Sequence, residues 1–174
     1  HESAILAFAA DIDGTQAVSA SEDGRIRLWG FFGEKVKKVS DLWIEQKLVQ
    51  SLALFQGKAG RLLLVGCKNG EIFLYRIAQT WTRLASYRGS SKAVNSLCFL
   101  PNGKGVVAGS EDRQVRLWRF NSALETRKTR CYRLPSGIRQ IVSGYDRNTV
   151  LAVLGQDEML RLHVVDSNGI RPYS

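Results

Sequence analysis

The sequence predicts an all-β protein in which one four-stranded unit is repeated, and three observations support this fold class. The phrase "VSASEDGRIRLWGFF", which starts at Val18, returns as "VVAGSEDRQVRLWRF" from Val106. Within these phrases the apolar residues alternate with a period of two rather than 3.6, as they do in strands. Gly, Asn and Asp separate the short runs, as they do in tight turns.

Four units of similar length follow one another along the chain. Each has an Asp or Asn before a strand-like run, and the residues in this place are Asp23, Asn69, Asp112 and Asp157. Their spacings are 46, 43 and 45 residues. The runs that follow are "RIRLW", "EIFLY", "QVRLW" and "MLRLH", and they end on Trp29, Tyr75, Trp118 and His163. A fixed aromatic ring is therefore part of the repeat.

The third unit shows the strand pattern of a single repeat most clearly. We predict its strands at 93–99, 105–109, 114–119 and 128–134, with "LPNGKG" from Leu100 as a hairpin turn. The Asn-Gly pair tolerates the positive φ angles that such turns require. Each unit is therefore expected to contain four antiparallel strands.

This pattern resembles the WD-repeat β-propeller family, whose blades are four-stranded sheets of roughly 40–45 residues around a channel. The fullest match, "GSSKAVNSLCFLPNGKGVVAGSEDRQVRLWR" from Gly89, follows the family's order of Gly-His position, inner strand, turn, second strand, Asp turn and Trp-Asp ending. The resemblance covers essentially the whole chain. It implies a single partial propeller over residues 1–174, with blades at approximately 1–44, 45–88, 89–133 and 134–174.

The resemblance also implies a buried hydrogen-bond network that braces each blade through a His, a Ser or Thr, the turn Asp and the Trp. By position, the first unit fills all four places with His1, Ser19, Asp23 and Trp29. The third unit keeps Asp112 and Trp118, but Ser90 and Ala108 occupy its other two places. The last Asp of the Trp-Asp pair is absent from every unit. Most blades are expected to depend on apolar packing, because a half-satisfied buried network costs more than an apolar one.

Four units raise the question of how the propeller closes. Members of the family most often have seven blades, and an open stack of four would expose apolar faces and strand edges at both ends. We therefore expect four blades of a larger propeller of about seven. The chain would be either a fragment of a longer polypeptide or a half that another chain completes. A closed ring of four blades is the alternative.

The composition is that of an ordinary globular domain. The chain has 174 residues and 44% hydrophobic content, which is typical of a soluble protein. No apolar stretch approaches the roughly 20 residues that span a bilayer, so membrane insertion is not expected. Cys67, Cys98 and Cys131 lie in separate segments without a Cys-x-x-Cys pair, which favours a reducing, intracellular compartment. Cys67 and Cys98 are expected to be buried hydrophobic residues.

Catalytic chemistry finds little support in the sequence. Both His residues occupy blade positions, and no zinc-protease, serine-hydrolase or phosphate-loop motif occurs. The repeated Asp residues are interpreted as turn residues that accept hydrogen bonds from backbone amides. Arg27, Arg116 and Arg161 share one strand position, where we expect their heads to reach solvent or a carboxylate; a phosphate-binding ring is the alternative. We expect no catalytic residue, metal site, cofactor or small-molecule substrate.

Positive charge is the strongest compositional signal. The formal net charge is +9 and the sequence pI is about 9.8, which suits nucleic acid or an acidic protein surface as partner. A candidate binding rim on two predicted outer strands consists of Lys35, Lys37, Lys38, Arg127, Lys128, Arg130, Tyr132 and Arg133. These residues either form a contact surface or protect an exposed sheet edge from pairing.

Two functional hypotheses follow, and a fold does not by itself define which applies. The first rests on analogy with the family, and the second rests on the basic rim. The first is a non-catalytic scaffold for other proteins, a subunit of an intracellular multiprotein assembly. The alternative is a ribonucleoprotein or ribosome-associated component that binds RNA through the basic rim, with an affinity that falls steeply with salt. Cytoplasmic and nuclear locations fit equally well.

Overall fold

The computed structural model describes residues 1–11, 13–44, 49–57, 60–88, 90–101, 103–121, 126–144, 149–166 and 169–173. In this described part every regular element is a strand. The first sheet contains β1 (Ile5–Ala10), β2 (Gln16–Ser21), β3 (Arg25–Phe32) and β4 (Lys35–Trp43). The second contains β5 (Val49–Gly57), β6 (Gly60–Cys67), β7 (Glu71–Ile77) and β8 (Trp81–Arg88).

The other two sheets repeat this arrangement. The third contains β9 (Val94–Phe99), β10 (Gly105–Ser110), β11 (Gln114–Phe120) and β12 (Thr126–Arg133). The fourth contains β13 (Ile138–Ser143), β14 (Thr149–Gly155), β15 (Leu160–Asp166) and β16 (Gly169–Pro172). Each sheet pairs consecutive strands in antiparallel order. The predicted all-β fold of four-stranded blades is confirmed, and the strands predicted for the third unit agree with β9 to β12 within two residues.

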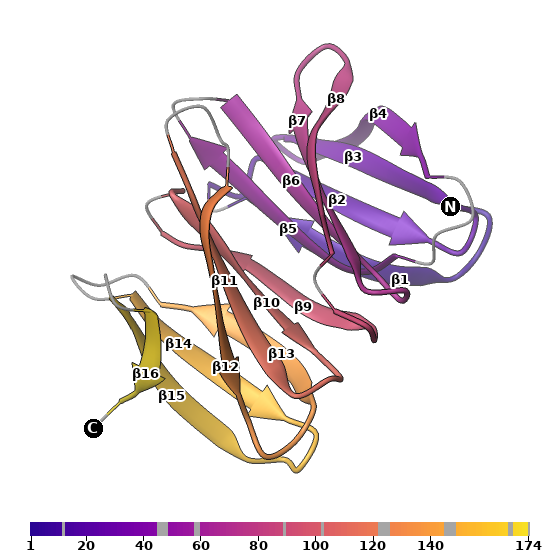
Figure 1. The fold of residues 1–174 in the computed structure, drawn as a ribbon. Helices are drawn as coiled ribbons and strands as arrows, with labels where there is room; N and C mark the ends of the chain where they lie inside the picture. Colours follow the sequence, from indigo (N-terminus) through magenta and orange to yellow (C-terminus); the bar gives the residue numbers. More distant parts are fainter. Residues whose placement is uncertain are drawn as a thin grey trace.

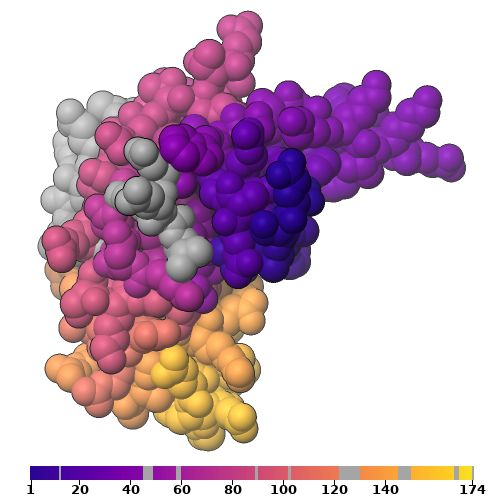
Figure 2. All heavy atoms as spheres, turned by 90° about the vertical axis from the view of Figure 1, so that its right-hand side faces the viewer, coloured from indigo at the N-terminus to yellow at the C-terminus, as the bar shows by residue number. Residues whose placement is uncertain are grey.

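The four sheets stand side by side along an arc, with the chain termini at opposite ends (Figure 1). The first strand of each sheet lies innermost, so that β1 contacts β5, β5 contacts β9 and β9 contacts β13. Among the described residues, β1 and β13 do not form a corresponding contact. From the side, the indigo N-terminal and yellow C-terminal segments occupy separate parts of the surface (Figure 2). The stack is therefore open rather than a closed four-bladed ring.

Three hydrophobic cores hold the stack together, one between each pair of neighbouring sheets. The first core joins residues such as Ile26 of the first sheet to Leu63 of the second. The second core contains Leu64 and Val106, and the third contains Leu117 and Ile141. Because strand side chains alternate between the two faces, each middle sheet supplies apolar side chains to two cores. Burial of these faces drives the sheets together.

The same repeat positions become exposed at the two ends of the stack. Five residues after the turn Asp or Asn, Leu28, Leu74 and Leu117 are 2%, 0% and 1% exposed, whereas Leu162 of the last sheet is 46% exposed. On the inner strands, Leu52, Leu97 and Ile141 are 7%, 6% and 3% exposed, whereas the corresponding Phe8 is 79% exposed. Each end therefore carries the apolar half of a core between blades.

The turn before the third strand requires a left-handed residue in every unit. The residue after the turn Asp or Asn has a positive φ in all four units: Gly24 at 75°, Gly70 at 85°, Arg113 at 69° and Glu158 at 61°. Glycine adopts this conformation without a steric penalty, whereas a side chain with a Cβ does not. The third and fourth turns are therefore strained relative to the first two.

Replacement of Arg113 by Gly is expected to stabilise the protein. Relief of about 1–2 kcal/mol of left-handed strain offsets the roughly 0.5–1 kcal/mol that glycine costs through unfolded-chain entropy, so Arg113→Gly gains up to about 1.5 kcal/mol. The control Gly24→Ala introduces the same strain into the first turn and lowers stability. Urea unfolding measures both free energies, and a destabilised Arg113→Gly protein would contradict this assignment.

Candidate functional site

The turn Asp or Asn has the same structural role in each sheet. Its Oδ1 accepts a hydrogen bond from the backbone N–H two residues later, with N···O distances of 2.9, 3.1, 3.1 and 3.3 Å for Asp23, Asn69, Asp112 and Asp157. Such bonds fix a tight turn locally. This geometry is the one expected for Asp residues that organise a tight turn.

In the first sheet, the four residues singled out by the family resemblance form one connected network. His1 Nε2 lies 2.6 Å from Ser19 Oγ, and His1 Nδ1 lies 3.1 Å from Asp23 Oδ2. Trp29 Nε1 donates to Ser19 Oγ at 2.8 Å. The network connects the segment before β1 to β2, the turn and β3, and it therefore positions these parts of the blade relative to one another.

The third sheet builds a different network around Asp112. Ser90 Oγ donates to Asp112 Oδ2 at 2.8 Å and lies 2.7 Å from Ser110 Oγ. By position the network lacks a hydroxyl at Ala108, but Ser110, two residues later, supplies one. Trp118 packs its ring against Tyr87, with the centroids 5.9 Å apart.

The three repeated Arg residues pair with the turn Asp rather than forming a ring that faces a ligand. The closest N···O distances are 3.4 Å for Arg27–Asp23, 2.6 Å for Arg116–Asp112 and 2.7 Å for Arg161–Asp157. The second sheet has Asn69 and Phe73 at these two positions, so both charges are missing together. The expectation that the Arg heads reach a carboxylate is therefore confirmed.

Electrostatics favour the ionised form of Asp112. Partial burial raises its pKa, but hydrogen bonds from Arg116, Ser90 and the Gln114 backbone outweigh this effect and hold the pKa below its ordinary value.

In the fourth sheet, burial lowers the pKa of His163, and the nearby Arg161 acts in the same direction. The buried ring nitrogens of His163 have no hydrogen-bond partner among the described residues.

The predicted basic rim lies on outer strands of the first and third sheets. Lys35, Lys37 and Lys38 are exposed on β4, and Arg130 and Arg133 are exposed on β12. The side chains of Arg127 and Lys128 lie outside the described residues. Tyr132 is half-buried against the third core, where its ring lies 5.1 Å from that of His163, so it packs inward.

The positive charge extends beyond the predicted rim to two more outer strands. Further exposed cations lie on the outer strands β8 and β16, namely Arg83, Arg88 and Arg171. Asp41 is the one acidic residue in the sequences of the four outer strands. The segment "WTRLASYR" contains Arg83 and Arg88, but these two residues are too far apart in the sequence to form a recognisable basic run.

A β-bulge occurs at the same place on every inner strand, next to the channel. The pairing of each inner strand with its neighbour skips one residue, and the four skipped residues are Leu6, Gln50, Asn95 and Arg139. All four line one hollow of about 400 Å³. Bulges redirect side chains and are common next to binding sites. This set was not predicted, because a bulge depends on strand register rather than on residue type.

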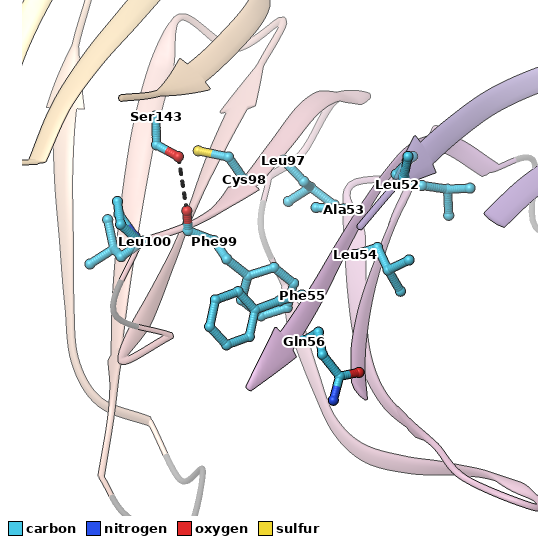
Figure 3. Close-up of a pocket in the computed structure, with 13 residues that line it drawn as sticks. Leu52, Ala53, Leu54, Phe55, Gln56, Leu97, Cys98, Phe99, Leu100 and Ser143 are labelled. Carbon is cyan, nitrogen blue, oxygen red and sulfur yellow. Dashed lines mark hydrogen bonds between the residues drawn. The ribbon is translucent and has the colours of Figure 1, made fainter. Parts of the chain in front are cut away.

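An apolar pocket of about 370 Å³ lies at the other end of the inner strands (Figure 3). The rings of Phe55 and Phe99 lie against each other in it, with a centroid distance of 5.2 Å. Ser143 Oγ donates to the Phe99 carbonyl at 3.0 Å. The neighbouring Cys98 is expected from the sequence to be buried but is half-buried in the pocket wall. Desolvation still raises the pKa of its thiol to about 12, so this cysteine is unreactive.

The other two cysteines are also free thiols. Cys67 is buried in the first core, as expected for a small hydrophobic residue, whereas Cys131 is exposed on β12.

In the part of the chain that the structure describes, there is no helix with the length and apolar character needed to cross a membrane.

Comparison with known proteins identifies repeats in two parts of the chain. The family model "WD domain, G-beta repeat" matches residues 1–30 and 81–119. Nuclear distribution protein PAC1 of Candida albicans is 40% identical over 52 residues, which cover 30% of this chain and 10% of that protein. The U3 small nucleolar RNA-associated protein 15 homolog of Xenopus tropicalis is 31% identical over 111 residues, or 64% of this chain and 20% of the relative.

A third relative matches more of the chain. WD repeat-containing protein ATCSA-1 of Arabidopsis thaliana is 27% identical over 126 residues, which cover 72% of this chain and 27% of that protein. The matches to these three relatives thus span 10%, 20% and 27% of their lengths.

Removal of the Asp112 charge is expected to lower stability without breaking the turn. Asp112→Asn keeps the turn acceptor, as Asn69 does naturally, but weakens the bonds to Arg116 and Ser90, at a cost of about 1–3 kcal/mol near neutral pH. The folded-state pKa lies below the ordinary value of 3.8, so the stabilisation is complete above pH 3.8 and is lost as pH falls through the folded-state pKa.

Urea unfolding across this acid range therefore separates the two proteins. The difference in unfolding free energy between the native protein and Asp112→Asn should shrink as the pH falls below 3.8. Glu22→Gln, which neutralises an exposed acid in the turn of the first sheet, is the control and should leave stability nearly unchanged. A pH-independent difference for Asp112→Asn would contradict the electrostatic assignment.

Proposed function

We propose that this chain, a member of the WD-repeat family, forms part of a larger propeller that acts as a non-catalytic scaffold in an intracellular multiprotein assembly. WD40 repeats are typical of protein-interaction scaffolds, and the fold is generally non-catalytic. The proposed blades occupy approximately residues 1–44, 45–88, 89–133 and 134–174 of one partial propeller domain. Further blades, about three for a seven-bladed ring, complete the channel.

The main support for this proposal is the exposure of apolar side chains at the two ends of the stack. Phe8 and Leu162 occupy positions that are buried between blades elsewhere in the chain, and an additional blade on each side would bury them in the same way. Exposed apolar patches of this kind mark interaction surfaces. The short matches to much longer relatives support a propeller that extends beyond these four blades.

The names of two relatives support an intracellular location. One is a nuclear distribution protein and another is associated with a small nucleolar RNA. Both cytoplasm and nucleus fit this proposal. A rigid stack of sheets presents its loops, outer strands and channel to partners at a low entropic cost, because little of its surface must become ordered on binding.

The scaffold proposal predicts stable partners for the full native polypeptide. Purification from its natural source, followed by chemical cross-linking and mass spectrometry, should identify proteins linked to the loops and outer strands. Lysines such as Lys37 and Lys92 are exposed and provide cross-linking sites. A full polypeptide that migrates alone at its own mass, without cross-links to other proteins, would contradict the proposal.

A matched pair of variants tests closure separately from partner binding. Leu117→Ala removes a buried leucine between blades and should cost about 2–5 kcal/mol in any form of the protein. Leu162→Ala changes the corresponding exposed leucine, and it should approach that cost only when an additional blade covers the last sheet. Equal, small effects of Leu162→Ala in the full polypeptide and in residues 1–174 would argue against closure by a further blade.

RNA binding is a second candidate function, favoured by the outer strands. Exposed basic side chains occur on β4, β8, β12 and β16, against the single acidic Asp41. Phosphate backbones bind to such surfaces by releasing counterions. The name of the Xenopus relative, which refers to a small nucleolar RNA, agrees with this candidate.

The RNA candidate predicts salt-dependent binding of a fluorescein-labelled oligouridine. The variant Lys35→Glu/Lys37→Glu should weaken binding and reduce the salt slope by about 1 for each lost phosphate contact. Lys68→Glu/Lys92→Glu makes the same charge change at exposed loop residues away from the outer strands and serves as the control. Equal binding by both double variants would argue against an RNA surface on the outer strands.

A further inference from the structure

We infer that the channel wall holds an extended segment of a partner protein, with a large apolar side chain in the pocket of Figure 3 and a carboxylate against Arg139. This inference rests on the proposed scaffold function and specifies the chemistry of the partner. It does not depend on the basic outer strands, which lie on the far side of each sheet from the channel.

Three hollows along the inner strands form one continuous path. The apolar pocket shares Leu52 and Leu97 with the hollow in the middle of the channel wall. That hollow in turn shares Gln50, Asn95 and Arg139 with a polar hollow of about 350 Å³ at the starts of the inner strands. A single ligand can therefore contact both ends.

The apolar end of the path suits one large hydrophobic side chain. Its walls include Leu54, Phe55, Phe99 and Pro101. The Phe55 ring lies so close to Gly57 and Gly103 that a Cβ at either glycine would come within 2.6 Å of it. The two glycines thus provide the space for this ring. Pockets of this type accept the aromatic or aliphatic anchor residues that dominate binding energy at interfaces.

The middle of the path is rigid because inner-strand side chains bind the backbone of their neighbours. Ser51 Oγ donates to the Val94 carbonyl at 2.7 Å. Ser96 Oγ accepts a hydrogen bond from the Ile141 N–H at 2.9 Å, and Asn95 Nδ2 donates to the Ile138 carbonyl at 2.9 Å. These bonds satisfy backbone groups on the strand edges that face the channel. The wall is therefore organised before a ligand binds, which lowers the entropic cost of binding.

The polar end of the path favours a carboxylate. Arg139 is exposed on its bulge and forms no ion pair with any described residue. Its guanidinium can bind a carboxylate through two parallel hydrogen bonds. The amides of Gln50 and Gln156 line the same hollow, and Glu111 also lines it. Glu111 repels a second negative charge, so one acidic residue fits better than a phosphate backbone.

The length of the path sets the spacing of the two contacts. Gln50 and Phe55 mark its two ends on β5, and five residues of strand span about 17 Å. An extended partner segment therefore places its apolar and acidic residues about five positions apart. Single-stranded RNA fits less well, because the Phe55 and Phe99 rings pack against each other at a tilt of 32° instead of presenting open faces to bases.

Selection from a displayed library of random peptides of about eight residues tests this specificity on the full polypeptide. The expected consensus contains a large apolar residue and an Asp or Glu about five positions apart. A fluorescein-labelled synthetic peptide with that consensus should then bind in fluorescence anisotropy. Selected peptides that lack either feature, or the absence of any selected peptide, would overturn the inference.

Two variants with matched controls assign the contacts within the path. Arg139→Glu should weaken the peptide at least tenfold, and replacement of its acidic residue by Lys should restore binding to this variant. Ala10→Trp fills the pocket from an exposed wall position and should also weaken binding at least tenfold. The controls Arg76→Glu and Ala78→Trp make the same changes at exposed positions away from the path. Circular dichroism confirms that each variant folds.

The outcomes separate this inference from the scaffold proposal. If Arg139→Glu and Ala10→Trp bind the selected peptide as tightly as the native protein does, the channel assignment is wrong. Partners that still cross-link to the native polypeptide would then leave the scaffold function intact on another surface. Preferential binding of an oligouridine, lost in Arg139→Glu, would replace the peptide by RNA and would also overturn the inference.

Discussion

The need to cover both faces of every sheet is the constraint on which the rest of this structure depends. Each sheet places apolar side chains on alternate faces, so a core forms only where two sheets meet. The chain builds three such cores from four sheets and exposes the remaining faces at Phe8 and Leu162. An uncovered apolar face at each end of the stack follows from this geometry rather than from any single motif.

A second constraint concerns the inner edges of the sheets. Within the described residues, the first strand of each sheet pairs with no strand on its channel side, and the backbone groups there need other hydrogen bonds. Ser51, Ser96 and Ser143 supply them by reaching across to the neighbouring inner strand. Small polar residues thus bring the inner strands together, and the bulges place one residue of each strand in the wall of the channel hollow. Stability and ligand access are provided by different positions of the same strand.

The sequence predicted those features that depend on local chemistry. The turn residues Asp23 and Asp112 mark the repeat because an Asx side chain bonds the backbone two residues later wherever this turn occurs. Spacing and alternation then placed the third-unit strands within two residues. The first-sheet contacts of His1 agree with the positions that the family resemblance indicated, since its motif reports a local three-dimensional arrangement.

Features that depend on register or on neighbouring sheets could not be predicted from residue types. The bulge at Arg139 exists because strand pairing skips one residue, and no composition signal marks that place. Ser110 replaces the hydroxyl missing at Ala108 because the Ser90 side chain reaches it across the turn. Tyr132, which the sequence placed among exposed basic residues, packs inward because the adjoining fourth sheet provides an apolar surface.

Comparison of the four sheets explains how the repeat tolerates divergence. Three sheets keep a paired Arg and Asp, whereas the second has Phe73 and Asn69 and loses both charges together. A charge without its partner would be costly at a partly buried site, so the pair is retained or removed as a unit. His163 departs from this rule, since its buried nitrogens lack partners in the described structure. That departure lies in the last sheet, whose outer face is uncovered, so this sheet, like the first, has apolar side chains on one face that no neighbouring sheet covers.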